Sequence, residues 1–167
     1  MIKAAFFNTR RKIMSSNETK RFLVPGNDQD RDAIMRGYCL VHTLNERYSS
    51  DVDHVILLIP VKENIRGGTL QSVLGEKISN SLFKGEEVFL NKSGKPMRLK
   101  TMRTLDGNVD KSIVFAVYAD WKMMDKTEKM DNLFAIVAVP CNDDSLDHWK
   151  DKWSPVIFEK AANNSKG

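Results

Sequence analysis

Two apolar runs decide the fold, VILLIP at residues 55–60 and LFAIVAVP at residues 133–140. Neither run alternates with polar residues, so both faces of each segment are expected to be covered. Uninterrupted runs of this kind are typical of central strands in a parallel sheet that has helices on both faces. Proline cannot donate a hydrogen bond to a neighbouring strand, so Pro60 and Pro140 mark where the two strands leave the sheet. The two runs therefore predict an α/β protein.

The segments around these runs supply helices and further strands. Apolar residues at three- and four-residue spacing predict helices over residues 30–48 and 69–84. Asn27 or Asp28 is expected to cap the first helix, and Thr69 the second. The remaining expected elements are a first strand at residues 2–8 or 22–24, a hairpin at residues 88–101, a strand at residues 113–118, helices at residues 121–130 and 145–153, and an edge strand at residues 156–158.

Strands that alternate with helices indicate parallel pairing through right-handed crossovers, and the hairpin adds some antiparallel pairing. We expect a three-layer sandwich of the Rossmann-like or flavodoxin-like kind, with a mostly parallel sheet and an inserted β-hairpin. The chain of 167 residues suits one domain, which we place at residues 1–160. Residues 161–167 are expected to form a disordered tail.

Composition and charge narrow the classes of protein. The net charge of +4 permits an anionic partner without requiring one. The two cysteines, Cys39 and Cys141, form no CxxC pair, and no cluster of histidine and cysteine has the spacing of a zinc site. We therefore expect reduced thiols in a cytoplasmic protein, with Cys39 in or near the core. The longest uncharged apolar run, residues 133–141, is far shorter than the ~20 residues that a membrane span needs.

The best single motif for ligand binding is the sequence RGGT at residues 66–69. It opens a helix directly after a strand, at the sheet edge where open α/β proteins bind their ligands. Backbone N–H groups of Gly67, Gly68 and Thr69 and the charges of Lys62 and Arg66 would favour an anion such as phosphate. The motif matches neither the Walker A sequence nor the dinucleotide fingerprint. The alternative interpretation is a flexible turn followed by a helix cap.

Three residues at strand ends are candidates for catalysis. Cys141 follows Pro140 ahead of an expected helix, where the pKa of a thiol can be lowered, and His148 is the base nearest to it in sequence. The alternative for Cys141 is a small buried residue at the end of a strand. Asp120 and Asp143 could orient a ligand or hold Mg²⁺, although capping of helices explains such carboxylates more simply. No histidines have metal-ligand spacing, so no metal site is predicted.

The last predicted helix carries two tryptophans that point to a protein partner. Trp149 and Trp153 are four residues apart and share one helical face. An exposed pair of this kind could anchor a partner, whereas a buried pair would pack the helix onto the sheet. In the preceding helix, Trp121 and Met124 are expected to face the core.

The return strand of the hairpin has a basic face. Arg98 and Lys100, with Lys95 and Arg103 nearby, could contact the phosphates of a nucleic acid. The strand lacks aromatic residues for base stacking, so we prefer to interpret it as a charged edge strand.

The sequence leaves three functional hypotheses. Because no catalytic constellation is recognised, the first is a non-catalytic binding or accessory protein that acts through protein–protein contacts, homodimers included. The second is an enzyme or sensor that binds a nucleotide or another phosphorylated small molecule at the carboxyl edge of the sheet. The third is a weak nucleic-acid binder that uses the basic hairpin. Whether the protein catalyses a reaction, and with which cofactor, stays open.

Overall fold

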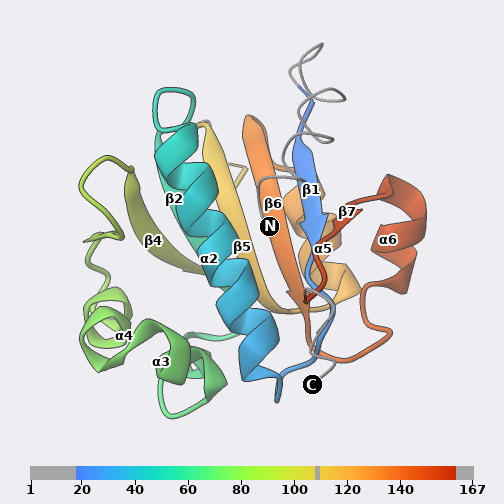
Figure 1. Ribbon diagram of the computed structural model, residues 1–167, viewed down its shortest axis with the longest axis horizontal. Helices are drawn as coiled ribbons and strands as arrows, with labels where there is room; N and C mark the ends of the chain where they lie inside the picture. Colours follow the sequence, from blue (N-terminus) through green and yellow to red (C-terminus); the bar gives the residue numbers. More distant parts are fainter. Residues whose placement is uncertain (1–17, 108–109, 161–167) are drawn as a thin grey trace, which may run out of the picture.

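Seven strands form one sheet in the computed structural model, which describes residues 18–107 and 110–160 (Figure 1). The order across the sheet is β3-β4-β2-β5-β6-β1-β7. Neighbouring strands run parallel except β3 and β4, which form the antiparallel hairpin predicted from the sequence. The strands are β1 (Lys20–Leu23), β2 (His54–Ile59), β3 (Val88–Phe89), β4 (Pro96–Thr101), β5 (Ser112–Ala119), β6 (Leu133–Pro140) and β7 (Val156–Ile157).

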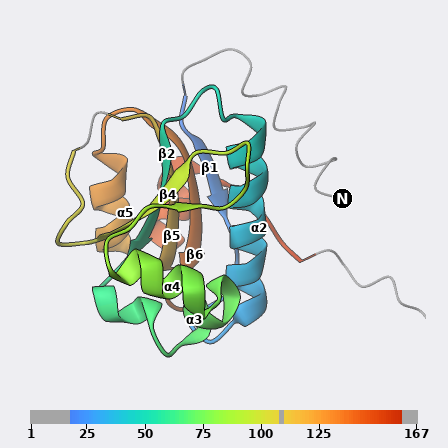
Figure 2. The same cartoon turned by 90° about the vertical axis from the view of Figure 1, so that its left-hand side faces the viewer.

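Helices cover both faces of this sheet, as Figure 2 shows for α2 on one side of the strands and α5 on the other. The first face carries α2 (Arg31–Arg47), α3 (Thr69–Leu74) and α4 (Glu76–Phe83), which share one apolar core with the strands. The second face carries α5 (Trp121–Glu128) and α6 (Asp147–Trp153), which share a separate core. A 3-10 turn, η1 (Lys62–Ile65), follows β2. None of the helices in the described residues is long and apolar enough to cross a membrane.

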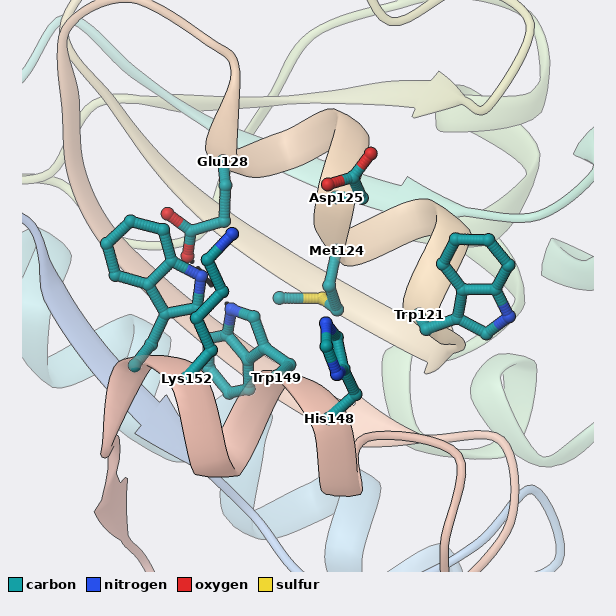
Figure 3. A pocket seen from close by; sticks show the side chains of 8 residues that line it. Trp121, Met124, Asp125, Glu128, His148, Trp149 and Lys152 are labelled. Carbon is teal, nitrogen blue, oxygen red and sulfur yellow. Dashed lines mark hydrogen bonds between the residues drawn. The ribbon is translucent and has the colours of Figure 1, made fainter.

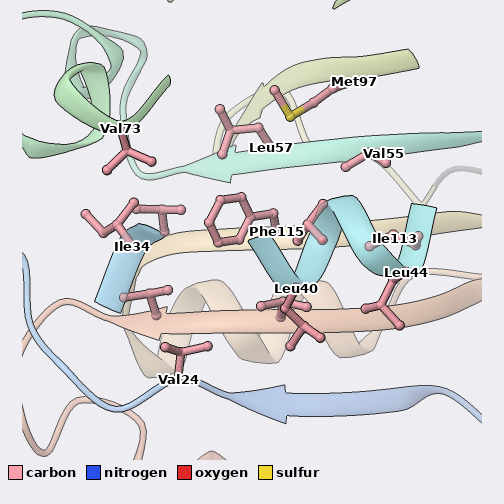
Figure 4. Packing of buried hydrophobic residues seen from close by; sticks show 14 of the residues in the cluster. Val24, Ile34, Leu40, Leu44, Val55, Leu57, Val73, Met97, Ile113 and Phe115 are labelled. Atoms are coloured by element: carbon pink, nitrogen blue, oxygen red, sulfur yellow. The ribbon is translucent and has the colours of Figure 1, made fainter. Parts of the chain in front are cut away.

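The two proline-ended runs are the central strands that the sequence predicted. Every residue of β2 and β6 is buried. Alternate side chains of β2 enter the two cores: Leu57 packs under α2 and Ile56 packs under α5. Figure 4 shows Leu57 and Phe115 of the first core facing Ile34 and Leu40 of α2. Burial on both faces is the physical reason why these runs contain no polar residue.

The strand order is that of flavodoxin, except that a different strand occupies the fifth place. Counted along the chain from β2, the strands β2, β4, β5 and β6 lie in the order 2-1-3-4, and β1 occupies the fifth place although it is the first of the described strands along the chain. From β2 the chain turns toward β4, and from β5 it turns the opposite way, toward β6. The point between the carboxyl ends of β2 and β5 is therefore the topological switch point, where ligands of open α/β sheets bind.

Several predicted helix ends differ from the structure. The cap of α2 is Asp30, not Asn27 or Asp28, and its carboxylate accepts a hydrogen bond from the Ala33 N–H at 3.0 Å. Gly68 occupies the cap position of α3, and Thr69 is already helical. The single helix predicted here is two helices, because the chain turns at Gly75 with φ of 87°, a value that favours glycine.

The predicted first strand and final helix are also corrected in part. Of the two candidates for the first strand, the one at residues 22–24 overlaps β1, which begins earlier, at Lys20. Residues 2–8 and the expected tail at 161–167 lie outside the described residues. The last helix begins at Asp147 rather than at residue 145.

Two side chains predicted to face the core are exposed. Trp121 was expected inside, but its side chain is 55% exposed because Met123 and Met124 supply the buried face of α5. Cys39 was also expected in or near the core, yet it is exposed on α2 and forms no disulfide.

Candidate ligand-binding cleft

A cleft of about 510 Å³ lies at the carboxyl edge of the sheet, at the switch point between β2 and β5. Five segments far apart in the sequence meet there. Asp28 comes from the loop after β1, and Pro60 from the end of β2. Thr69 begins α3, Tyr118 lies near the end of β5, and Cys141 follows β6. Of the residues that the sequence singled out, Arg66, Gly68, Thr69 and Cys141 line this cleft.

Tyr118 reaches this cleft through an irregularity in β5. Its φ is 58°, a left-handed value that is uncommon for an aromatic residue, and the pairing of β5 with β6 shifts between Val117 and Ala119. Phe115 and Val117 face the first core, so strict alternation would turn Tyr118 toward the second core. Tyr118 instead packs against the first core, on the side of α2 and α3. The bulge thus redirects the side chain toward the cleft.

The hydroxyl of Tyr118 is bonded to the start of α3. It accepts a hydrogen bond from the Leu70 N–H at 3.0 Å, and the Thr69 side chain is a second hydrogen-bond partner. Burial raises the pKa of Tyr118, the two hydrogen bonds oppose that rise, and the charge of Asp28 adds to it. At neutral pH the hydroxyl therefore keeps its proton.

Cys141 lacks the electrostatic surroundings of an activated nucleophile. Burial raises the pKa of its thiol, and the nearby carboxylates of Asp28 and Asp120 raise it further. The expected lowering of this pKa is therefore not found. His148 lines a different cavity, between α5 and α6, so the structure does not bring this base to the thiol.

The predicted phosphate-binding set is only partly assembled. Arg66, Gly68 and Thr69 line the cleft, whereas Lys62 and Gly67 do not. Arg66 and Lys62 both lie over the Phe83 ring, with Arg66 Cζ 3.3 Å and Lys62 Nζ 4.4 Å from its centroid.

Two backbone N–H groups of the same loop are already used inside the protein. The Gly67 N–H donates to the Gln71 side chain, and the Leu70 N–H donates to Tyr118. The helix α3 that follows has only six residues. A phosphate on this loop would therefore find fewer free donors than the sequence suggested.

The acidic candidates have separate roles. Asp120 caps α5, where its Oδ1 accepts the Met123 N–H at 2.9 Å. Asp143 does not line the cleft, whereas Asp28 and Glu63 do. Across residues 18–107 and 110–160, no three histidine, cysteine or acidic side chains are grouped so as to hold a metal ion.

The three tryptophans of the chain line one small cavity, of about 130 Å³, between α5 and α6. Trp149 is only 3% exposed, and its Nε1 donates to Glu128 at 2.9 Å, so it packs the last helix onto the sheet (Figure 3). Trp153 is 37% exposed and lies under the Arg21 guanidinium, 4.0 Å from Cζ to the ring centroid. Trp121 is the most exposed of the three.

The basic hairpin strand is less free than its sequence suggested. The strand β4 lies between β2 and β3, so it is not the edge of the sheet. Arg98 is paired with Glu87, with 2.7 Å between Nε and Oε1. A nucleic acid would have to compete with this ion pair.

Sequence reasoning missed Tyr118 and the cleft role of Asp28. Tyr118 was hidden in the apolar run at residues 113–118, and nothing in its residue type signals a left-handed backbone. The one sequence feature that could have indicated Tyr118 is its position, directly before Ala119 and Asp120, where the strand ends at the predicted binding edge. Asp28 was considered only as a helix cap.

No protein-family model matches the chain, and comparisons with curated proteins and with solved structures find no match. The fold alone does not determine a function, so the function has to be argued from the site.

Proposed function

We propose that this protein binds a small polar molecule in the cleft at the carboxyl edge of the sheet. One observation carries the proposal: the cleft lies at the switch point between β2 and β5, and a strained residue, Tyr118, is directed toward it. A left-handed backbone at a residue other than glycine costs of order 1–3 kcal/mol, and such strain clusters at functional sites.

The size and lining of the cleft support a metabolite-sized ligand. Its volume of about 510 Å³ lies within the range of small-molecule sites, which runs from about 300 to 1,000 Å³. The charged side chains that line the cleft have both signs: Asp28 and Glu63 are acidic, and Arg66 is basic. This mixture favours a ligand with both hydrogen-bond donors and acceptors over a polyphosphate. A nucleotide with several phosphates is therefore the less favoured ligand. We also propose a cytoplasmic location, which the two free cysteines, Cys39 and Cys141, support.

A thermal-shift screen with organic acids, sugars, nucleotides and phosphorylated metabolites tests the proposal. A ligand that binds only the native state at a hundred times its Kd stabilises it by about 2.7 kcal/mol. We expect one chemical class to raise the Tm of the wild-type protein and of Arg98→Ala, an arginine outside the cleft. The same class should lose its effect on Arg66→Ala. A shift that persists in Arg66→Ala, or a screen without any shift, contradicts the proposal.

A second candidate function is self-association through the cavity between α5 and α6. Its exposed rim combines Trp121 and Trp153 with an acidic residue, Asp125, and a basic one, Lys152. A surface that carries both charges beside apolar rings can complement itself across a two-fold axis.

Sedimentation equilibrium tests this second candidate. We expect a dimer that Trp153→Ser dissociates, while Phe89→Ser, an exposed aromatic residue on β3, leaves it intact. A monomer at high concentration, or equal effects of the two substitutions, contradicts self-association at this surface.

A further inference from the structure

The hydrogen bonds of Tyr118 leave one group of the cleft without a partner. A phenol oxygen has one proton to donate and can also accept hydrogen bonds. Here the oxygen accepts from the Leu70 N–H and is bonded to the Thr69 side chain. The bond between the Tyr118 and Thr69 hydroxyls uses one of their two protons, because either oxygen can accept from the other. Thr69 lines the same cleft, and no described residue is bonded to the second proton, so one hydroxyl proton of this pair is available to a ligand in the cleft.

Arg66 adds a second group of donors on the same cleft. Its guanidinium lies over the Phe83 ring, 3.3 Å from Cζ to the centroid, and this contact restrains the position of the side chain. Among residues 18–107 and 110–160, no carboxylate forms a salt bridge with it. A stacked guanidinium presents its N–H groups at its edge, where they match the two oxygens of a carboxylate.

The other charges limit how much negative charge a ligand can carry. Asp28 and Glu63 line the same cleft, so a doubly charged phosphate would meet two carboxylates against one guanidinium. A ligand with a single negative charge avoids most of this repulsion. Hydroxyl or ammonium groups on that ligand would in turn find acceptors in Asp28 and Glu63.

Building on the proposed function, we propose that the ligand is a small carboxylic acid that also bears a hydroxyl or amino group, and that Tyr118 and Arg66 together bind its carboxylate. Asp28 and Glu63 accept hydrogen bonds from the hydroxyl or amino group. Because burial keeps the pKa of Tyr118 above its ordinary value, the phenol is a donor throughout the neutral range.

Two pairs of probes test this ligand class by ¹H–¹⁵N correlation NMR of the full chain. Lactate and its neutral amide form the hydroxy-acid pair, and alanine and its amide form the amino-acid pair; inorganic phosphate is the fifth probe. Binding is followed at the backbone amides of Gly68, Leu70 and Cys141. We expect at least one acid to shift these amides and to bind more tightly than its own amide. The two pairs distinguish a hydroxy acid from an amino acid.

Tyr118→Phe separates donation to the ligand from a purely structural role. We expect it to weaken binding of the acid about ten- to hundredfold and to reduce the preference for acid over amide, part of which Arg66 retains. Tyr38→Phe, a partly buried tyrosine on α2 outside the cleft, should leave both unchanged. If Tyr118→Phe weakens acid and amide equally, the tyrosine only supports α3 and the inference is wrong.

The remaining outcomes distinguish the inference from the proposed function. If phosphate or the two amides shift the backbone signals of the cleft while the acids do not, the cleft binds ligands but the carboxylate assignment is overturned. If no probe shifts these amides at millimolar concentration, and the thermal-shift screen is also without effect, the proposed function fails together with the inference.

Discussion

His54 shows how one buried residue connects packing to pH. It is 1% exposed at the start of β2, and its Nε2 lies 3.2 Å from the Ser112 hydroxyl. Burial lowers the pKa of His54 below its ordinary value, and the charge of Arg98 lowers it further. Three carboxylates act in the opposite direction, those of Asp110, Asp53 and Glu87.

The protein is expected to lose stability in mild acid because of this histidine. With a lowered native pKa, the unfolded chain binds the proton first, so stability is complete above about pH 6.5 and falls as the pH drops below that value. The slope for one proton is at most about 1.4 kcal/mol per pH unit. Urea unfolding between pH 7.5 and 5 measures it.

The variant His54→Gln should make this pH dependence shallower. His42 is the matched control, because burial also lowers its pKa but the residue is only partly buried on α2. We expect His42→Gln to change the slope less. Equal slopes for the wild-type protein and His54→Gln would show that His54 titrates alike in the folded and unfolded chains.

At the scale of elements, the sequence predicted what depends on local pattern. The runs that form β2 and β6 were recognised because burial on both faces excludes polar residues over their whole length. The helix predicted at 30–48 was correct within one residue at each end. The break at Gly75 was missed, because Leu70, Val73 and Ile78 continue one apolar stripe across it. Periodicity reports which face is buried and does not report whether the backbone bends.

The contact of α2 with the sheet depends on a glycine. A Cβ atom at Gly37 would lie 2.8 Å from Phe115 Cε1 and 3.1 Å from Val139 Cγ2. Alanine is the better helix former by about 1 kcal/mol, but overpacking of a core costs about 1–3 kcal/mol. We expect Gly37→Ala to lower the free energy of unfolding by about 1 kcal/mol, as measured by urea denaturation.

Cys39→Ala is the control for this substitution on the same helix. Its side chain is exposed, so we expect a change within about 0.5 kcal/mol. A Gly37→Ala variant as stable as the wild-type protein would mean that α2 can move away from β5 and β6 at little cost.

At the scale of the whole molecule, the pairing of distant segments was beyond the sequence. No local pattern states that β1 lies beside β6, or that β5 lies between β2 and β6. The same holds for the candidate cleft. Its position at the carboxyl edge was predictable from the parallel strands, whereas the set of residues that line it was not. Lys62 was predicted there and does not line the cleft, while Tyr118 was unforeseen and lies at the switch point.

One network links three elements across the second face. The Glu128 carboxylate of α5 accepts hydrogen bonds from Arg21 Nε at 2.8 Å and Nη2 at 2.7 Å, and from Trp149 Nε1 at 2.9 Å. The Glu128 side chain is 7% exposed and that of Arg21 is 15% exposed. Removing one partner of a buried pair leaves the other charge uncompensated, which costs about 3–5 kcal/mol.

We therefore expect Glu128→Ala to lower the free energy of unfolding by about 3 kcal/mol. Asp125→Ala is the control on the same helix, because its salt bridge with Lys129 is exposed and should contribute less than about 0.5 kcal/mol. A double-mutant cycle with Arg21→Ala gives the coupling energy of the pair. A loss for Glu128→Ala as small as that for Asp125→Ala would contradict a stabilising role for the network.

The place of β1 between β6 and β7 has a consequence for the order of events during synthesis. The Thr19 hydroxyl donates to the Leu133 carbonyl, across 114 positions of chain. A ribosome adds about 5–20 residues per second, so β1 and α2 emerge several seconds before β6 exists to receive them. Until then the apolar side of α2 has only part of its partner surface, and long-range parallel pairing is slow to form. Although β1 precedes the other described strands in the chain, it is thus among the last of them to be paired, and a chaperone that shields α2 would act during that interval.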